Sequence, residues 1–410
     1  MKHPTSRSTK PSRSTRRVKS VQPPMRILVS PSGFKESLGP SEVASCIEAG
    51  IRRVVPDADV RKVPLADGGE GFARALVEAT GGTLHTLTVT GPTGASIPSH
   101  FGMLGGKDGG PRTAVVEMAA AAGLALVPAG ARDPTATTTH GVGELIAAAL
   151  DRGAERVVVG CGDSGTSDGG AGMLQALGAR LLDGDGEELA RAGGGGDLAR
   201  LADIDMAGLH PRVRRVEIDV ACNWRNELCG PAGVARVYGP QKGATPAQVE
   251  LLAGALDNYA AVARGRLGCD VARTPGGGAS GGMGAGLVLL GARLRPRYEA
   301  VMEYFGIGDL FADCQLVITA EGGIDRQTPQ GKIPAEVALR AKAFGIPVIA
   351  LAGTVGAGAD VNYNAGIDAF TSILQAPTTL DRAIEEAEQL LTDAAEASMR
   401  MVLVGLALRM

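Results

Sequence analysis

Residues 157–170 read VVVGCGDSGTSDGG, a short apolar run followed by a loop with five glycines. The run is short enough for a buried strand, and a segment typical of a helix follows the loop. A purely structural turn rarely needs the eleven residues 160–170, so this loop is predicted to bind a ligand. Backbone N–H groups in such a loop can surround a phosphate group.

The same order of strand, loop and helix recurs toward both ends of the chain. Helices are predicted to begin near residues 40 and 334. Residues 83–110 alternate like extended strands with turns, and the glycine-rich residues 190–196 are predicted to form a surface loop. The alternation is typical of a parallel sheet with crossover helices and predicts an α/β fold. Further strands are predicted at 27–30, 60–63, 316–319 and 348–351.

Length and composition limit the classes of protein that remain. A chain of 410 residues has room for two or three domains. No apolar run approaches the roughly 18 residues that a membrane-spanning helix needs, so no membrane partner is expected. Glycine is about twice as frequent as usual, at 60 of 410 residues, but it has no three-residue period, which excludes collagen.

The net charge of −3 conceals an uneven distribution. Residues 1–24 carry seven basic side chains and no acidic one, and they are predicted to be a disordered tail rather than a secretory signal. Subtracting these seven charges leaves −10 for the rest, which offers no broad basic face for a nucleic acid. The six cysteines lack zinc-site spacing and are predicted to be reduced thiols in the cytoplasm.

Five glycine-rich loops carry polar or charged side chains where strands are predicted to end or helices to begin. Ligands of open α/β sheets bind at the carboxyl ends of the strands, and helix N-termini attract phosphates. Each loop alone would be a weak signal, and their number is the stronger one. The loops begin at Ser32, Asp67, Gly160, Tyr238 and Glu321.

Two of these loops allow more than one interpretation. In residues 67–71, Asp67 and Glu70 suit a magnesium ion or a polar substrate. They equally suit a helix N-terminus, with Asp67 as N-cap and Glu70 completing a capping box. Lys35, in the first loop, is either a phosphate contact or a solvated surface lysine. Both alternatives stay open from the residues alone.

Several known fingerprints are absent. The chain has no G-x-x-x-x-G-K-[ST], which excludes a P-loop. Residues 141–144 do not match the G-x-S-x-G of an α/β-hydrolase, and residues 282–286 are only a weak match to a dinucleotide fingerprint. A nucleotide-dependent dehydrogenase is therefore disfavoured.

Seven short motifs are spread over the chain from about Arg26 to the C-terminal region. They occupy residues 31–38, 64–71, 117–120, 143–146, 168–172, 239–244 and 321–328. In these motifs the chain resembles the bacterial type I glycerate kinase family. The resemblance leaves out only the basic tail, and the seven motifs together are highly specific.

The resemblance implies ATP-dependent, Mg²⁺-assisted phosphorylation of D-glycerate at the 2-hydroxyl. It also implies two α/β domains with the active site in the cleft between them. Residues 25–82 plus 290–410 would form a Rossmann-like parallel-sheet domain, and residues 83–289 would form the inserted domain. The expected partners are glycerate and ATP, and a homodimer is a possible assembly.

The resemblance assigns roles to the residues of the glycine-rich loops. Phosphoryl transfer needs alignment of the hydroxyl and neutralisation of phosphate charge. Asp67 and Asp168 are expected to hold Mg²⁺. The catalytic candidates are Asp67, Glu70, Asp168, Asp325 and Lys35. The candidates for binding substrate or phosphate are Ser164, Gly169, Asn226, Lys242, Glu321 and Lys332.

The chain departs from the family pattern at several of the positions compared. Ser32, Asn223 and Arg225 stand where the family has acidic residues, and Gly323 stands where it has an arginine. The family commonly reads G-G-S-A-T-N-D-G-G in the 160–170 loop, where this chain has Asp163, Gly165 and Ser167 instead. Lost carboxylates can change the contacts to a metal or a hydroxyl. Three alternatives therefore remain: another small hydroxy acid as substrate, 3-phosphoglycerate as product, or a non-catalytic sensor on the same scaffold.

Overall fold

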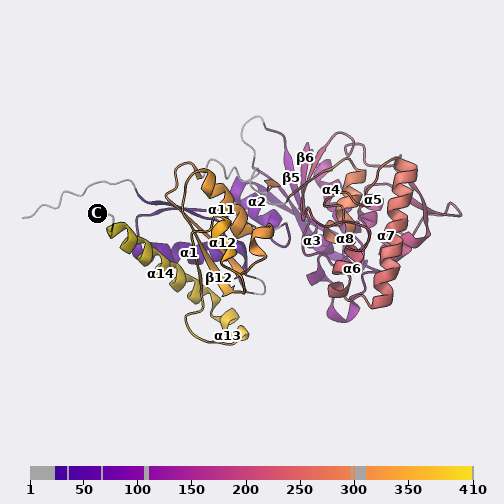
Figure 1. Ribbon diagram of the computed structural model, residues 1–410. Helices are drawn as coiled ribbons and strands as arrows, with labels where there is room; N and C mark the ends of the chain where they lie inside the picture. Colours follow the sequence, from indigo (N-terminus) through magenta and orange to yellow (C-terminus); the bar gives the residue numbers. More distant parts are fainter. Residues whose placement is uncertain are drawn as a thin grey trace, which may run out of the picture.

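The computed structural model describes residues 24–34, 37–65, 68–105, 110–296, 299–300 and 311–408. Two helix-covered β-sheets lie side by side, and helix α2 (Phe72–Thr80) lies between them (Figure 1). The predicted α/β fold class is confirmed. Among the described residues, no helix combines the length and the apolarity needed to cross a bilayer.

The first sheet has five parallel strands in the order β13-β12-β11-β1-β2. Numbered one to five along the chain, the strands lie in the order 2-1-3-4-5. The chain therefore extends the sheet first to one side of β1 and then, from β11 onward, to the other side. In doubly wound sheets such a reversal opens a crevice at the carboxyl ends of the two strands, where ligands bind. Each of the four strands predicted here overlaps one of β1 (Arg26–Val29), β2 (Asp59–Lys62), β11 (Leu316–Ile324) and β12 (Val348–Val355); the fifth is β13 (Ala369–Ser372).

Helices cover both faces of this sheet. On one face α1 (Pro40–Val54) packs against α14 (Ala387–Ala407), and Ile27 of β1 contributes to the same core. Leu28, the next residue, belongs to the core of the opposite face, which α2 and α11 (Ile333–Ala343) cover. This alternation is the period of two that a strand imposes. The shorter helices are α12 (Val361–Asn364) and α13 (Leu380–Glu385).

The second sheet has six strands in the order β10-β9-β6-β5-β4-β3. The antiparallel pair β3–β4 confirms the extended strands predicted within residues 83–110. The strands β5, β6, β9 and β10 are parallel, so the loops after them lie together at the carboxyl ends of these strands, which is the edge of the sheet meant below. The strands are β3 (Thr83–Thr90), β4 (Ser96–Met103), β5 (Thr113–Glu117), β6 (Arg156–Gly160), β9 (Glu217–Cys222) and β10 (Arg293–Pro296).

The elements around the second sheet include six helices and a separate two-stranded sheet. This small antiparallel sheet pairs β7 (Arg180–Asp183) with β8 (Leu201–Asp205). The helices are α3 (Ala119–Ala122), α4 (His140–Asp151), α5 (Ala171–Ala176), α6 (Val234–Tyr238), α7 (Pro246–Leu267) and α8 (Ala279–Leu289).

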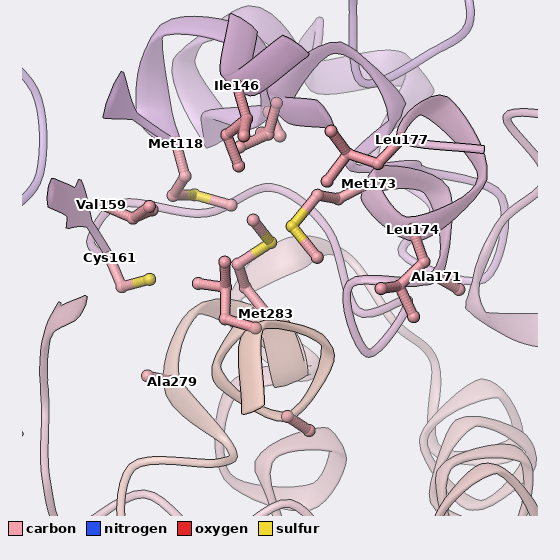
Figure 2. Close-up of a cluster of buried hydrophobic side chains, with 14 of the residues drawn as sticks. Met118, Ile146, Val159, Cys161, Ala171, Met173, Leu174, Leu177, Ala279 and Met283 are labelled. Carbon is pink, nitrogen blue, oxygen red and sulfur yellow. The ribbon is translucent and has the colours of Figure 1, made fainter. Parts of the chain in front are cut away.

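Three methionine side chains fill the core beneath the loops of this edge. Figure 2 shows Met118, Met173 and Met283 pointing toward one another, and Cys161 belongs to the same cluster. All three methionines are fully buried and come from separate segments. Because methionine is flexible, it can fill irregular space between segments that do not pack as regular layers. The loops therefore pack on an apolar core that is rich in sulfur atoms.

One local prediction is only half right. Residues 190–196 are predicted to form a surface loop, and Ala190 and Arg191 are exposed, but Gly194 and Gly195 are buried. A Cβ atom on Gly195 would lie 2.2 Å from the carbonyl oxygen of Ser167, so this stretch packs directly against the 160–170 loop. It leads into a short 3₁₀ helix, Gly195–Arg200.

The domain boundaries stay predictions. The strands of the first sheet come from residues 26–62 and 316–372, and those of the second from residues 83–296. Strand β10 follows residue 290 but pairs with β9 of the second sheet. Of the predicted basic tail, only Pro24 lies within the described residues.

The close approach of α1 and α14 gives a test of the fold. A Cβ atom on Gly50 of α1 would lie 2.3 Å from the carbonyl oxygen of Thr392 and 2.7 Å from the Cβ of Ala395. We expect Gly50→Ala to lower the free energy of unfolding by about 1–3 kcal/mol, measured by urea unfolding. Gly254→Ala in α7 is the control, because its Cβ would meet nothing within 4 Å. Equal stability of the two variants would contradict the packing described.

Candidate functional site

The two sheets meet at their loops. The segment 68–71, which follows β2 of the first sheet, contacts the loop after β6 of the second. The backbone N–H of Glu70 donates to Oδ2 of Asp163 at 3.2 Å. A Cβ atom on Gly68 would lie 3.2 Å from the carbonyl oxygen of Ala221, at the end of β9. Loops from the carboxyl ends of both sheets therefore form one junction.

Two exposed carboxylates lie at this junction. The side chains of Glu70 and Asp163 are both solvent-exposed. Asp163 has a φ of 48°, a left-handed conformation that is uncommon for a residue with a side chain. The predicted catalytic residues Asp67 and Lys35 lie outside the described residues.

The start of α2 is capped from another strand. Its N-cap is Gly71, with a φ of 86° and no side-chain cap. This excludes one of the two interpretations left open by the sequence, the capping box with Asp67 as N-cap and Glu70. Instead the carboxylate of Glu117, at the end of β5, accepts hydrogen bonds from the N–H groups of Gly71 and Ala73, both at 3.0 Å. Burial raises the pKa of Glu117 to about 7, although the two hydrogen bonds oppose the rise.

Asp168 lies inside the 160–170 loop and is fully buried. Its carboxylate accepts from the N–H and the hydroxyl of Thr139, each at 2.8 Å, and from the N–H groups of Gly170 and Gly172, each at 3.2 Å. Burial raises its pKa, and these hydrogen bonds work against the rise. In this arrangement Asp168 braces the loop from within.

A run of threonines that sequence reasoning missed braces the same loop. Thr137, Thr138 and Thr139 are all buried. The hydroxyl of Thr137 donates to the carbonyl oxygen of Gly165 at 2.9 Å, while the hydroxyl of Thr139 accepts from the N–H of Met173 at 3.0 Å. Three consecutive threonines before a helix are a visible signal, but their partners lie elsewhere in the chain.

The structure brings the predicted binding residues Ser164 and Lys242 together. The ammonium of Lys242 donates to Oγ of Ser164 at 2.9 Å and to the carbonyl oxygen of Thr166 at 2.5 Å. Its side chain is buried. Burial lowers the pKa of Lys242 to about 7, and the negative charge of Asp168 partly offsets this effect. Lys242 therefore stabilises the loop through hydrogen bonds made from its buried side.

A glycine run before and within α8 lies against the loop as well. The N–H of Gly169, a predicted binding residue, donates to the carbonyl oxygen of Gly281 at 3.0 Å. A Cβ atom on Gly281 would lie 1.9 Å from the carbonyl oxygen of Thr166, so only glycine fits there. The backbone is left-handed from Ser280 to Gly282, which kinks α8. The glycines are visible in the sequence, where they give only a weak match to a dinucleotide-binding fingerprint. Their packing against the 160–170 loop could not be predicted from that match.

Three other predicted residues gather at the carboxyl end of β11. The ammonium of Lys332 donates to the carbonyl oxygen of Gly323 at 3.1 Å and lies 3.8 Å from both Oε1 of Glu321 and Oδ1 of Asp325. Lys332 is the N-cap of α11 and its side chain is 31% exposed, so it remains accessible to a ligand. The N–H of Ser32 donates to Ala320 at 2.8 Å, which places this group at the reversal of strand order between β1 and β11.

Asn226 lies in the loop after β9. Its Oδ1 accepts from the hydroxyl of Tyr238 at 3.1 Å, and its carbonyl oxygen accepts from the N–H of Gly278 at 2.9 Å. The neighbouring Trp224 and Arg225 are exposed. This loop follows a strand parallel to β6, so it belongs to the same edge as the 160–170 loop.

The described ranges contain no group of three or more His, Cys, Asp or Glu side chains placed to hold a metal ion. This does not conflict with magnesium chemistry, because Mg²⁺ usually takes one or two carboxylates together with water and substrate phosphates. Exposed carboxylate oxygens of that kind occur at the junction, on Glu70 and Asp163. The metal roles of Asp67 and Asp168 stay predictions.

The buried ammonium of Lys242 gives the stability a dependence on pH. Between about pH 7 and pH 10 the folded protein binds fewer protons at Lys242 than the unfolded chain does, so this group makes the folded state more stable as pH rises. We expect the stability advantage of the wild type over Lys242→Met to grow from pH 7 to pH 9 in thermal unfolding. Lys342→Met, at a partly exposed lysine paired with Asp368, is the control and should show no such trend. A constant difference for Lys242→Met would contradict the buried, perturbed amine.

Comparison with known proteins identifies the family. The model of the glycerate kinase family matches residues 27–403. A glycerate kinase of Bacillus subtilis (strain 168) is 48% identical over 366 residues, 89% of this chain and 94% of that protein. A glycerate 2-kinase of Escherichia coli (strain K12) is 47% identical over 364 residues, 88% of this chain and 94% of that protein. A crystal structure from Salmonella typhimurium LT2, described as a glycerate kinase 2, matches with a TM-score of 0.81 and 45% identity, covering 94% of this chain and 100% of that one. The chain therefore belongs to the glycerate kinase family and is a kinase.

Proposed function

We propose that the protein transfers the γ-phosphoryl group of ATP to the 2-hydroxyl of D-glycerate and releases 2-phosphoglycerate. The observation that carries the proposal is the junction, where the backbone of Glu70, whose side chain is exposed, is held beside the loop 160–170. The name of the Escherichia coli relative, a glycerate 2-kinase, supports the 2-position. The reduced state of all six cysteines supports a cytoplasmic location.

Phosphoryl transfer depends on positioning and on neutralising charge, and the residues divide between these tasks. Lys332, with Lys35, supplies positive charge to the phosphates of ATP. The loop that contains Ser164 and Gly169 lies beside the phosphates, while the buried Lys242 keeps this loop in place. A bound Mg²⁺ neutralises charge on the phosphate oxygens.

The carboxylates divide into bases, metal ligands and substrate contacts. Glu70, Asp67 or Asp325 accepts the proton of the attacking hydroxyl. Asp67 is the first candidate to hold Mg²⁺, because Asp168 would have to exchange its hydrogen-bond donors for the ion. On the substrate side, Asn226 and Glu321 are the candidates to bind the hydroxyl and carboxylate groups of glycerate.

A second candidate substrate is another small hydroxy acid. The exposed guanidinium of Arg225 lies after β9, at the edge where the junction forms. Its position suits a substrate with an additional negative charge. This alternative keeps the reaction and changes only the acceptor.

The proposal is tested by phosphorus NMR of the product formed from D-glycerate, ATP and Mg²⁺. We expect a 2-phosphoglycerate signal that disappears when the metal is chelated. Lys332→Met is expected to lower kcat by about 10²-fold, because a preorganised positive charge at the phosphate is lost. Lys342→Met removes a lysine at the far end of α11 and should leave kcat unchanged.

The possible products separate the alternatives. A 3-phosphoglycerate signal would show that the position of transfer is wrong. Turnover only with a larger hydroxy acid would favour the second candidate and identify Arg225 for mutation. Binding of neither ATP nor any hydroxy acid would contradict the proposed function.

A further inference from the structure

The segment 68–73 is held by carboxylates that belong to the other sheet. It follows β2 of the first sheet and carries the exposed side chain of Glu70. The N–H groups of Gly71 and Ala73 donate to the two oxygens of Glu117, and the N–H of Glu70 donates to Asp163. Glu117 ends β5 and Asp163 follows β6, so both anchors come from adjacent strands of the second sheet.

Both anchors carry an energetic cost in the folded state. Glu117 is 1% exposed, and a buried carboxylate is unfavourable unless donors surround it. Asp163 keeps a left-handed backbone although glycine would adopt it more easily. Unfavourable conformations of this kind tend to occur where a functional group has to be placed.

Local capping alone does not explain the arrangement. A serine or an aspartate at the N-cap position would satisfy the first turn of α2 without any residue from a distant strand. The chain has Gly71 there and uses Glu117, which is 46 residues away, instead. The cap of α2 is thereby tied to the second sheet, which also carries the 160–170 loop.

We propose that Glu117 and Asp163 are positioning residues that fix the segment 68–73, and with it the carboxylate of Glu70, at the junction for phosphoryl transfer. This inference rests on the proposed function, in which Glu70 acts at the substrate hydroxyl. Neither anchor touches the reacting atoms in this role. Each acts through the backbone N–H groups that it holds.

The position of Glu70 then depends on the ionisation of Glu117. A protonated carboxyl group loses an acceptor site and can no longer receive both N–H groups equally well. The charged groups that face Glu117 are Glu70, which raises its pKa, and Arg74, which lowers it. Activity is therefore expected to fall as pH decreases through about 7, where Glu117 takes up a proton.

The decisive variant is Glu117→Gln, because glutamine has one acceptor oxygen and an NH₂ group that cannot receive an N–H. We expect kcat to fall at least tenfold, the KM for ATP to stay within about twofold, and the fall in rate below pH 7 to disappear. Glu155→Gln is the matched control. Glu155 also accepts a backbone N–H, that of Arg112 at 3.0 Å, but it lies just before β6, at the opposite end of the strand. It should keep the rate and the pH profile of the wild type.

Asp163→Gly separates positioning from stability. Glycine removes the anchor and also relieves the left-handed backbone, so we expect an unchanged or higher melting temperature together with a kcat about tenfold lower. Full activity of Asp163→Gly would overturn the role of Asp163. A Glu117→Gln enzyme that is less stable, but keeps the pH profile of the wild type, would reduce Glu117 to a helix cap.

Hydrogen exchange keeps the inference independent of the substrate. The amides of Glu70, Gly71 and Ala73 should exchange faster in Glu117→Gln than in the wild type, and Glu155→Gln should leave them unchanged. If the wild type fails to phosphorylate glycerate, the proposed function fails while this readout still tests the anchors. Unchanged exchange in Glu117→Gln would overturn the inference.

Discussion

Helix α2 has to pack against both sheets at once, and the place of the site follows from that constraint. Phe72 and Leu76 share one apolar cluster with Leu28 of the first sheet and Val158 of the second. A Cβ atom on Gly160 would lie 2.4 Å from the ring of Phe72, so β6 has to end in glycine for the ring to fit. The segment that carries Glu70 immediately precedes this helix. Apolar packing therefore brings it against the loop after β6, where the polar contacts are made.

The polar groups of the junction divide into buried and exposed sets. Glu117, Asp168 and Lys242 are buried, and each is surrounded by hydrogen-bond partners that compensate for the lost hydration. Glu70 and Asp163 are exposed. Buried groups of this kind are expensive to disturb, so they keep the loops in one arrangement. The side chain of Glu70 stays in contact with solvent beside these loops, and the proposed function assigns it to the substrate hydroxyl.

Sequence reasoning predicted the elements and several members of the site. The strand before residue 160, the glycine-rich loop after it and the placement of Lys332 at the start of α11 are all visible in local patterns. Ser164 and Lys242 are 78 residues apart in the chain. Both were predicted to belong to one binding site, but their direct contact was not predicted. The capping box failed for a physical reason: capping rules consider neighbours within one turn, whereas the acceptor used by α2 comes from β5. The threonine run was missed for the same reason, because its partners lie on another loop.

The sequence by itself determined the order of strands, loops and helices, the α/β class and the family, because these depend on local periodicity and on short motifs. Only the tertiary structure decided which carboxylate caps α2, which side chains brace the 160–170 loop and why Gly281 has no side chain. Those contacts join residues that are distant in the chain, and they depend on strand order and on how α2 packs between the sheets. Local periodicity carries no information about strand order, so the assembly of the site becomes visible only when both sheets are in place.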